Sequence, residues 1–132
     1  MKPRNIKIKR DPVRKCQYSK LNDGRLQIHQ DYGLWICSWI KENKVPAHKD
    51  PKPRYFQCFA ISQIIKGKGW LWTEEEGKKF FSAGESFIVF PDMLQDYNGV
   101  GSYYLEDSVC FTGPIADSLV KSGILRPGIV KV

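Results

Sequence analysis

The sequence contains little that could bind a metal ion. It has only two histidines, His29 and His48, and they stand apart in the chain. Its four cysteines lack both the short paired spacings of a zinc site and the density of a disulfide framework; they are Cys16, Cys37, Cys58 and Cys110. Most of them lie in apolar stretches, so we expect small buried hydrophobic side chains. The two histidines are interpreted as ordinary surface or loop residues.

Long hydrophobic runs are also absent. No stretch approaches the ~18 apolar residues that a membrane helix needs, and the basic N-terminus lacks the apolar core of a signal peptide. With 132 residues, of which 42% are hydrophobic, the chain is long enough for one domain and too apolar for a disordered segment. These features predict a single soluble domain in the cytoplasm, with no membrane association.

Acidic residues are scarce in one part of the chain only. The net charge is +7, and residues 1–20 carry eight of the 21 basic residues but one of the 14 acidic residues, which leaves 13 of each sign in the remainder. A basic terminus can bind phosphates through counterion release, but it is more often a solvated tail without recognition detail. We therefore predict a basic arm over residues 1–20 and an electrically neutral folded domain over residues 21–132.

Short apolar stretches separated by turn residues fill most of the sequence. Strands are expected at residues 31–40, 55–65, 69–73, 78–82, 86–90 and 103–111. Residues 21–30 are expected to form a hairpin or an irregular lead-in. Residues 41–54 contain three prolines and are expected to form a loop, because proline is excluded from the interior of helices and central strands. One short helix is expected over residues 114–123, with Pro114 in its first turn and Gly123 at its exit. Such closely spaced strands are typical of an antiparallel sandwich or barrel.

Residues 66–97, KGKGWLWTEEEGKKFFSAGESFIVFPDMLQDY, resemble the cupin-type ligand-binding domain found at the N-terminus of AraC-family transcription regulators. The resemblance is carried by a Gly-x-Gly turn, a hairpin glycine, an Ala-Gly-Glu turn, a turn from proline to tyrosine, and the segments VCFTGP and GILRP. These motifs lie at residues 67–69, 77, 83–85, 91–97, 109–114 and 123–127. The resemblance covers roughly residues 50–132.

The resemblance implies an all-β fold of the cupin type, which is a double-stranded β-helix or jelly-roll barrel with a short C-terminal helix. It also implies the function of a sensor domain, in which a small, sugar-like effector binds in the barrel and controls DNA binding by a separate domain. The helix-turn-helix units that bind DNA in such regulators are expected beyond Val132, so DNA is predicted as a partner only through them. A homodimer is the expected assembly.

The resemblance does not extend to the metal ligands of cupin enzymes. Those enzymes carry two histidines and a glutamate on the hairpin strands, and a further histidine in the turn after the proline. Here the hairpin carries Trp70, Trp72 and Glu74–Glu76, and Gln95 stands in the turn. A glutamine amide and solvated carboxylates suit a transition metal poorly, and no pairing of a nucleophile with a base is evident. The sequence therefore predicts no metal, no other cofactor and no enzymatic activity.

Two sets of side chains are candidates for binding a ligand. Trp70 and Trp72 are two residues apart in a strand and point to the same side; they either form an aromatic wall for a ring-shaped ligand or belong to the core. Tyr104, Glu106 and Ser108 share one face of the last strand. That face is either the barrel interior, where a carboxylate must be paired or hydrated, or the solvated exterior.

Positions in the resembled family add three further candidates, which are Arg54 at the start of its strand and Gln95 and Tyr97 at the rim of the pocket. Gln95 in place of the family's histidine, and Asp92 in place of the turn's glycine, leave the identity of the ligand open. Two other functions are compatible with the sequence. One is a stand-alone cupin enzyme, such as a sugar isomerase or epimerase, and the other is a barrel without a ligand that serves as a dimerisation module.

Overall fold

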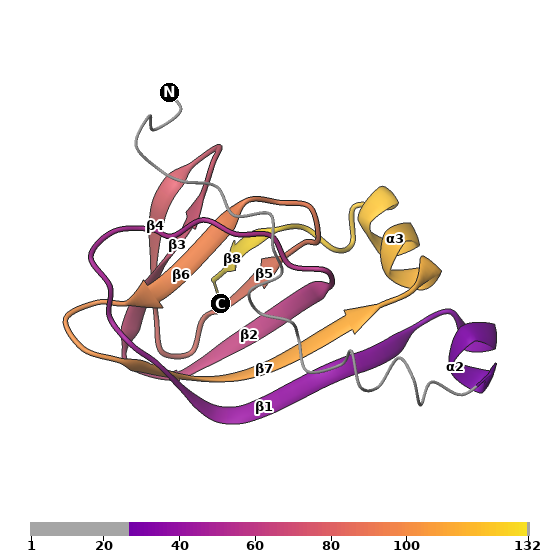
Figure 1. The fold of residues 1–132 in the computed structure, drawn as a ribbon, viewed down its shortest axis with the longest axis horizontal. Coiled ribbons are helices and arrows are strands. Elements are labelled where there is room, and N and C mark those ends of the chain that lie inside the picture. Colours follow the sequence, from indigo (N-terminus) through magenta and orange to yellow (C-terminus); the bar gives the residue numbers. More distant parts are fainter. Residues whose placement is uncertain (1–26, 132) are drawn as a thin grey trace.

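The computed structural model describes residues 27–131, so the predicted basic arm over residues 1–20 lies outside the described part. Within these described residues the chain forms two short helices and eight strands (Figure 1). In chain order these are α2 (Gln27–Tyr32), β1 (Trp35–Val45), β2 (Phe59–Lys66), β3 (Lys68–Thr73), β4 (Gly77–Ser82), β5 (Ser86–Val89), β6 (Gln95–Gly99), β7 (Tyr104–Thr112), α3 (Pro114–Lys121) and β8 (Gly128–Val130). None of the described helices is long and apolar enough to cross a membrane.

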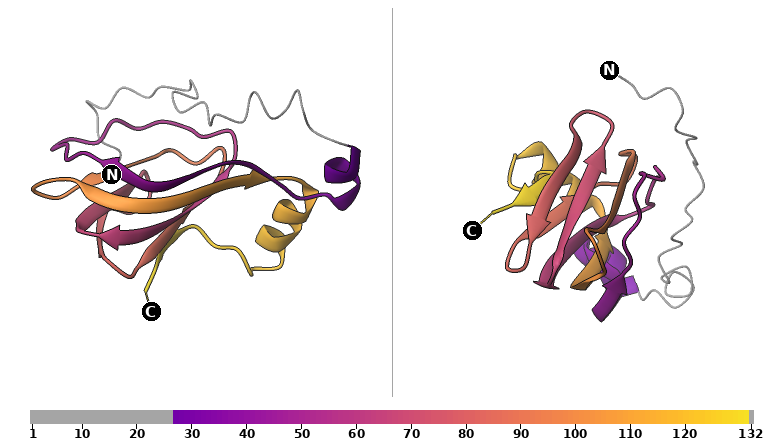
Figure 2. Two further views of the ribbon diagram at one scale, coloured as in Figure 1. Left: turned by 90° about the horizontal axis from the view of Figure 1, so that it is seen from below. Right: turned by 90° about the vertical axis from the view of Figure 1, so that its left-hand side faces the viewer.

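The strands form two antiparallel sheets with a jelly-roll connectivity. One sheet has the order β1-β7-β2-β5-β8 and the other has the order β4-β3-β6. Residues 47–54 run beside β6, to which they are joined by bridges between Ala47 and Gly99 and between Arg54 and Gln95. The chain therefore crosses repeatedly from one sheet to the other, and the two sheets face each other across the molecule (Figures 1 and 2). The predicted all-β jelly-roll barrel with a short C-terminal helix is confirmed.

The space between the sheets holds the main hydrophobic core. Its members are Val45, Phe56, Ala60, Ile64, Leu71, Phe81, Phe87, Val89, Tyr97 and Tyr104. Aromatic rings join the two sheets: the Phe81 ring meets the Tyr104 ring edge-on at 5.1 Å, and the Phe87 and Tyr97 centroids are 4.9 Å apart. Such aromatic pairs contribute about 0.5–1.5 kcal/mol each beyond the area that they bury.

Two glycines of the Gly-x-Gly turn have different structural roles. Gly67 has a φ of 91°, a conformation that side chains rarely adopt, and it makes the turn from β2 to β3. Gly69 lies within β3, and a β-carbon there would come within 2.6 Å of the Phe81 ring. The second glycine is therefore required by the close packing of β3 against Phe81.

Several element boundaries differ from those predicted. Residues 27–32 form α2, although an irregular lead-in and the start of a strand were expected there. Strand β1 continues to Val45 and ends before Pro46, because the first residues of the predicted loop contain no proline. Strands β6 and β8 were not expected: β6 is rich in polar residues, and β8 has only three residues. In both cases hydrogen bonding to a neighbouring strand, β3 for β6 and β5 for β8, produces a strand that the local sequence does not predict.

Candidate ligand site inside the barrel

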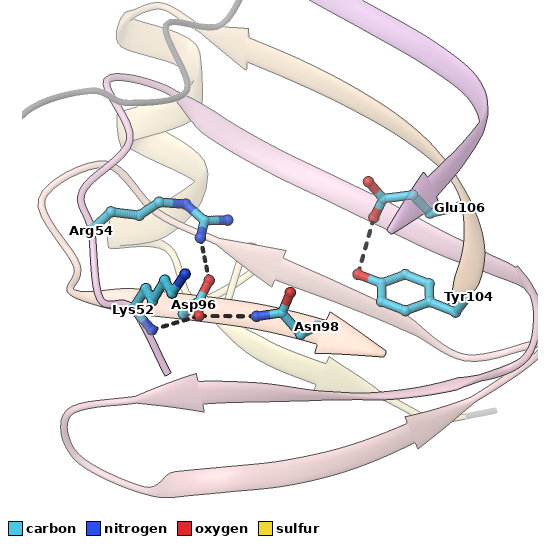
Figure 3. Close-up of polar contacts among 6 residues, drawn as sticks. All are labelled: Lys52, Arg54, Asp96, Asn98, Tyr104 and Glu106. Atoms are coloured by element: carbon cyan, nitrogen blue, oxygen red, sulfur yellow. Dashed lines mark hydrogen bonds and ion pairs between the residues drawn. The ribbon is translucent and has the colours of Figure 1, made fainter. Parts of the chain in front are cut away.

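Glu106 lies on the face of β7 that is turned toward the interior. Its exposed fraction is 1%, so the solvated alternative does not apply. Its carboxylate accepts a hydrogen bond from Asn43 Nδ2 at 2.9 Å. It also accepts one from the Tyr104 hydroxyl at 3.4 Å (Figure 3). An ionised carboxylate can accept about four hydrogen bonds. Within the described part of the chain it has no ion pair, so Glu106 retains the capacity to accept further hydrogen bonds.

Hydroxyl groups continue this polar face along β7. Ser108 lies two residues after Glu106, and its Oγ accepts a hydrogen bond of 3.3 Å from Ser62 Oγ on the neighbouring β2. Ser62 is itself buried, with an exposed fraction of 1%. Sequence reasoning missed Ser62 and Asn43, because only the register of β7 with its two neighbours brings them to the predicted residues.

Arg54 is held at the opposite end of the barrel by a buried ion pair with Asp96 of β6 (Figure 3). The Asp96 carboxylate also accepts hydrogen bonds from the Lys52 backbone N–H at 2.8 Å and from Asn98 Nδ2 at 3.1 Å. The guanidinium carbon of Arg54 lies 4.8 Å from the centroid of the Tyr97 ring, within the range of a cation–π interaction. Arg54 is therefore oriented and electrically neutralised by its own surroundings.

Gln95 differs from the other polar residues of the site because its side chain makes no hydrogen bond within the described part of the chain. It opens β6, it is fully buried, and neither its side-chain oxygen nor its side-chain nitrogen has a hydrogen-bond partner in the described part of the chain. Its position in the strand places it on the same side as Tyr97, which belongs to the core. An unpaired buried amide destabilises a fold by about 1–3 kcal/mol. A ligand that forms hydrogen bonds with the Gln95 amide would remove this destabilisation.

One reading of the sequence placed Trp70 and Trp72 on the wall of the barrel interior, but they do not lie there. Their cross-strand partners on β6 are Asn98 and Asp96, whereas Leu71 pairs with Tyr97 on the side of the core. The two tryptophans instead form a separate buried cluster with Leu94 on the outward side of the three-stranded sheet. Gly69, Leu71 and Thr73 take the inward positions of β3, so the residues that alternate with them, Trp70 and Trp72, face outward.

Hollows in the surface lie at the ends and outside of the barrel. One of about 360 Å³ lies beside Trp70 on the outward side of the three-stranded sheet. Two others, of about 280 and 570 Å³, share Thr73 and Gly128 in their walls and lie between the β3–β4 hairpin and the segment leading into β8. Thr73 is the direct cross-strand partner of Gln95. The crevice formed by these two hollows therefore lies beside the partner residue of Gln95, and it is the candidate entrance to the barrel interior.

The predicted site residues fall into three places. Gln95, Tyr97 and Arg54 lie at the end of the barrel beside the crevice, Tyr104 and Glu106 lie toward the other end, and Ser108 lies between them. Among residues 27–131, no three His, Cys, Asp or Glu side chains are close enough to hold a metal ion together. The lack of a resident metal or cofactor stays a prediction.

Comparisons with known proteins give similarities only to solved structures. No family model and no curated protein matches the sequence. The chain is similar to a cupin protein from Bacteroides fragilis, with 21% identity, a TM-score of 0.45, and coverage of 62% of this chain and 67% of that chain. It is also similar to an RmlC-like cupin family protein with a double-stranded β-helix fold from Methanocaldococcus jannaschii, with 20% identity, a TM-score of 0.45, and coverage of 67% and 76%.

Proposed function

We propose that this chain binds a small, hydroxyl-rich molecule of the sugar class inside its barrel, and that it is the effector-sensing part of an AraC-type transcription regulator. The observation that carries the proposal is the fully buried Gln95 amide, which has no hydrogen-bond partner in the described part of the chain. A folded protein seldom retains such a group without a compensating role. A ligand that reaches Gln95 would supply the missing partner.

The chemistry of the interior favours hydroxyl groups on that ligand. Glu106 can only accept hydrogen bonds when ionised, Gln95 can donate and accept, and the Ser62 and Ser108 hydroxyls can do either. A hydroxyl is the one common group that complements all of them, because it both donates and accepts. Arg54 is already paired with Asp96, so the site does not call for an anionic ligand.

The regulatory part of the proposal is supported by the motifs at residues 67–97 and 109–127. In such a regulator the barrel does not contact DNA. DNA is bound by a separate domain, and the effector acts by binding one of two arrangements of the protein more tightly than the other. A homodimer is part of the same proposal.

A thermal-shift screen against neutral sugars, sugar alcohols and sugar acids tests the proposal. A ligand at a hundred times its Kd should stabilise the fold by about 2.7 kcal/mol through mass action. The response should be lost in Gln95→Leu and weakened in Glu106→Gln, while Asp117→Asn on the exposed surface of α3, away from the crevice, serves as the control. A panel in which no compound shifts the melting temperature would count against binding. Sugar binding by the full-length protein without any change in its DNA affinity would count against the regulatory role.

A further inference from the structure

One row of residues on the outward face of the five-stranded sheet is apolar from one edge of the sheet to the other. Cross-strand partners define a row of residues that crosses β1, β7, β2, β5 and β8: Trp39, Val109, Ile61, Ile88 and Gly128. The neighbours of Ile88, which are Phe87 and Val89, are fully buried in the core, so this row points away from it. The three-stranded sheet lies on the other side of these strands (Figures 1 and 2).

A second apolar row lies beside the first. Ile36 on β1 pairs with Phe111 on β7, which pairs with Phe59 on β2. Phe59 is buried within the protomer, with an exposed fraction of 4%, so Ile36 and Phe111 form the exposed part of this row. At the β1 edge the side chains are widely exposed, with exposed fractions of 70% for Trp39 and 58% for Ile36. Single exposed apolar residues are common on proteins, but a continuous apolar area that spans a whole sheet marks an interaction surface.

We propose that a second copy of this chain docks on this face, related to the first by a two-fold axis that runs parallel to β2. Such an axis reverses the row, so that Trp39 of one copy lies over Gly128 of the other and Ile61 meets Ile61 at the centre. The largest side chain of the row then faces the one position without a side chain. This match of shape within a single row is the self-complementarity that a two-fold interface requires.

The polar border of the face is compatible with the same arrangement. The next row along the strands contains Asp107, Gln63, Ser86 and Val130. Under the proposed axis Asp107 faces the uncharged Ser86 of the partner copy, and Gln63 faces its own counterpart. The axis therefore brings no two like charges of this row together, which would oppose association.

The area of the face indicates a dimer of modest affinity. The first row crosses five strands and the exposed part of the second row crosses two; these seven positions of ~4.8 Å by ~7 Å span roughly 235 Å², so two copies cover at least about 470 Å². Weak and transient complexes bury less than about 1,200 Å² in total, and stable ones about 1,600 Å². We therefore expect a dimer that dissociates in the micromolar range. This inference is independent of the proposed ligand.

Sedimentation equilibrium of the full chain over a range of roughly 1–500 µM tests the interface. The protein should pass from monomer to dimer with rising concentration, and Trp39→Glu should raise the dissociation constant at least about tenfold, since it buries a charge at the interface. Phe80→Glu is the matched control. Phe80 is an aromatic residue of similar exposure, 60%, on the other sheet, and its substitution should leave the constant unchanged.

The position of the axis has a separate test. Facing sheets pack ~10 Å apart, so Ile61→Cys should be joined to its counterpart by a short bismaleimide in far greater yield than Phe80→Cys or the wild type. A protein that stays monomeric at every concentration would overturn the proposal. So would a dimer that is weakened by Phe80→Glu and not by Trp39→Glu, or a dimer in which Ile61→Cys gives no additional cross-link.

Discussion

At the scale of single residues, the two faces of β6 carry two kinds of buried polar group. Asp96 is satisfied by three donors, from Arg54, Lys52 and Asn98. Gln95, the neighbouring residue in the same strand, has no such partners among the described residues. Fully satisfied buried groups fix a structure, whereas unsatisfied groups destabilise it unless a ligand completes them. The two side chains should therefore respond to substitution in opposite directions.

Replacing Gln95 with leucine should stabilise the protein in the absence of ligand. Leucine has a similar size and removes an amide that is buried without partners, so we expect a gain of about 1–3 kcal/mol in the free energy of unfolding. Urea denaturation monitored by circular dichroism gives the measurement. Gln57→Leu on the exposed surface is the control and should change the value by no more than about 0.5 kcal/mol. A loss of stability in the Gln95 variant would show that the amide is satisfied in the folded protein.

Replacing Asp96 with alanine should destabilise the protein by about 3 kcal/mol. The substitution leaves the largely buried Arg54 guanidinium without its counter-ion, and breaking a buried pair from one side typically costs about 3–5 kcal/mol. Lys131→Met provides the comparison, because it breaks the solvent-exposed pair with Glu85 and should cost less than about 1 kcal/mol. Equal effects of the two substitutions in urea denaturation would contradict the structural role given to Asp96.

At the scale of the elements, the alternation of β3 separates the barrel interior from the tryptophan cluster. Gly69, Leu71 and Thr73 face inward, and Trp70 and Trp72 face outward. The sequence shows that the tryptophans share a side, but it does not show which side. That choice is made by Phe81 of β4, whose ring occupies the space where a β-carbon of Gly69 would lie.

Gly69→Ala should therefore destabilise the protein by about 1–3 kcal/mol, the usual effect of overpacking a core. The added methyl group lies within 2.6 Å of the Phe81 ring, which must move. The double variant Gly69→Ala, Phe81→Leu should recover part of the loss relative to Phe81→Leu alone, and a double-mutant cycle measures this coupling. Strict additivity of the two substitutions would rule out the proposed clash.

The turn between β4 and β5 should make a pH-dependent contribution to stability. The Ser82 backbone N–H donates to the Glu85 carboxylate at 2.7 Å, and this bond, followed by the Lys131 ammonium group just after β8, lowers the pKa of Glu85 below its ordinary value of 4.5. A lowered pKa in the folded protein means that the stabilisation is complete above the ordinary pKa and is lost as the pH falls through the lowered one.

Glu85→Gln should thus reduce stability near neutral pH, and its difference from the wild type should shrink as the pH falls below the ordinary pKa of 4.5 and through the lowered pKa of Glu85. Urea denaturation at a series of pH values gives the measurement. Glu75→Gln, on the exposed tip of the β3–β4 hairpin, is the matched control. A difference between Glu85→Gln and the wild type that does not change with pH would exclude the carboxylate as its source.

At the scale of the whole molecule, the two sheets share one core, because aromatic rings from β4, β5, β6 and β7 meet between them. We therefore expect one cooperative unfolding transition. Tryptophan emission, to which Trp70 and Trp72 of the outward cluster contribute, and far-ultraviolet circular dichroism should give coincident curves. Two separate transitions would show that the sheets unfold independently.

The sequence by itself determined the features that depend on local chemistry. Short apolar stretches, turn glycines and a helix that starts with proline predicted a β barrel with one C-terminal helix, and the structure has that architecture. The alternation of β7 likewise placed Tyr104, Glu106 and Ser108 on one face. These patterns are local, because side-chain direction in a strand is set by the parity of its positions.

Only the tertiary structure decided which face of each strand is inside. It placed Glu106 in the interior beside Asn43 and turned Trp70 and Trp72 to the outside. It also assembled the apolar row from Trp39 to Gly128 out of five separate strands. Strand register and the choice of inward face depend on packing between segments far apart in the chain, and parity alone cannot specify them.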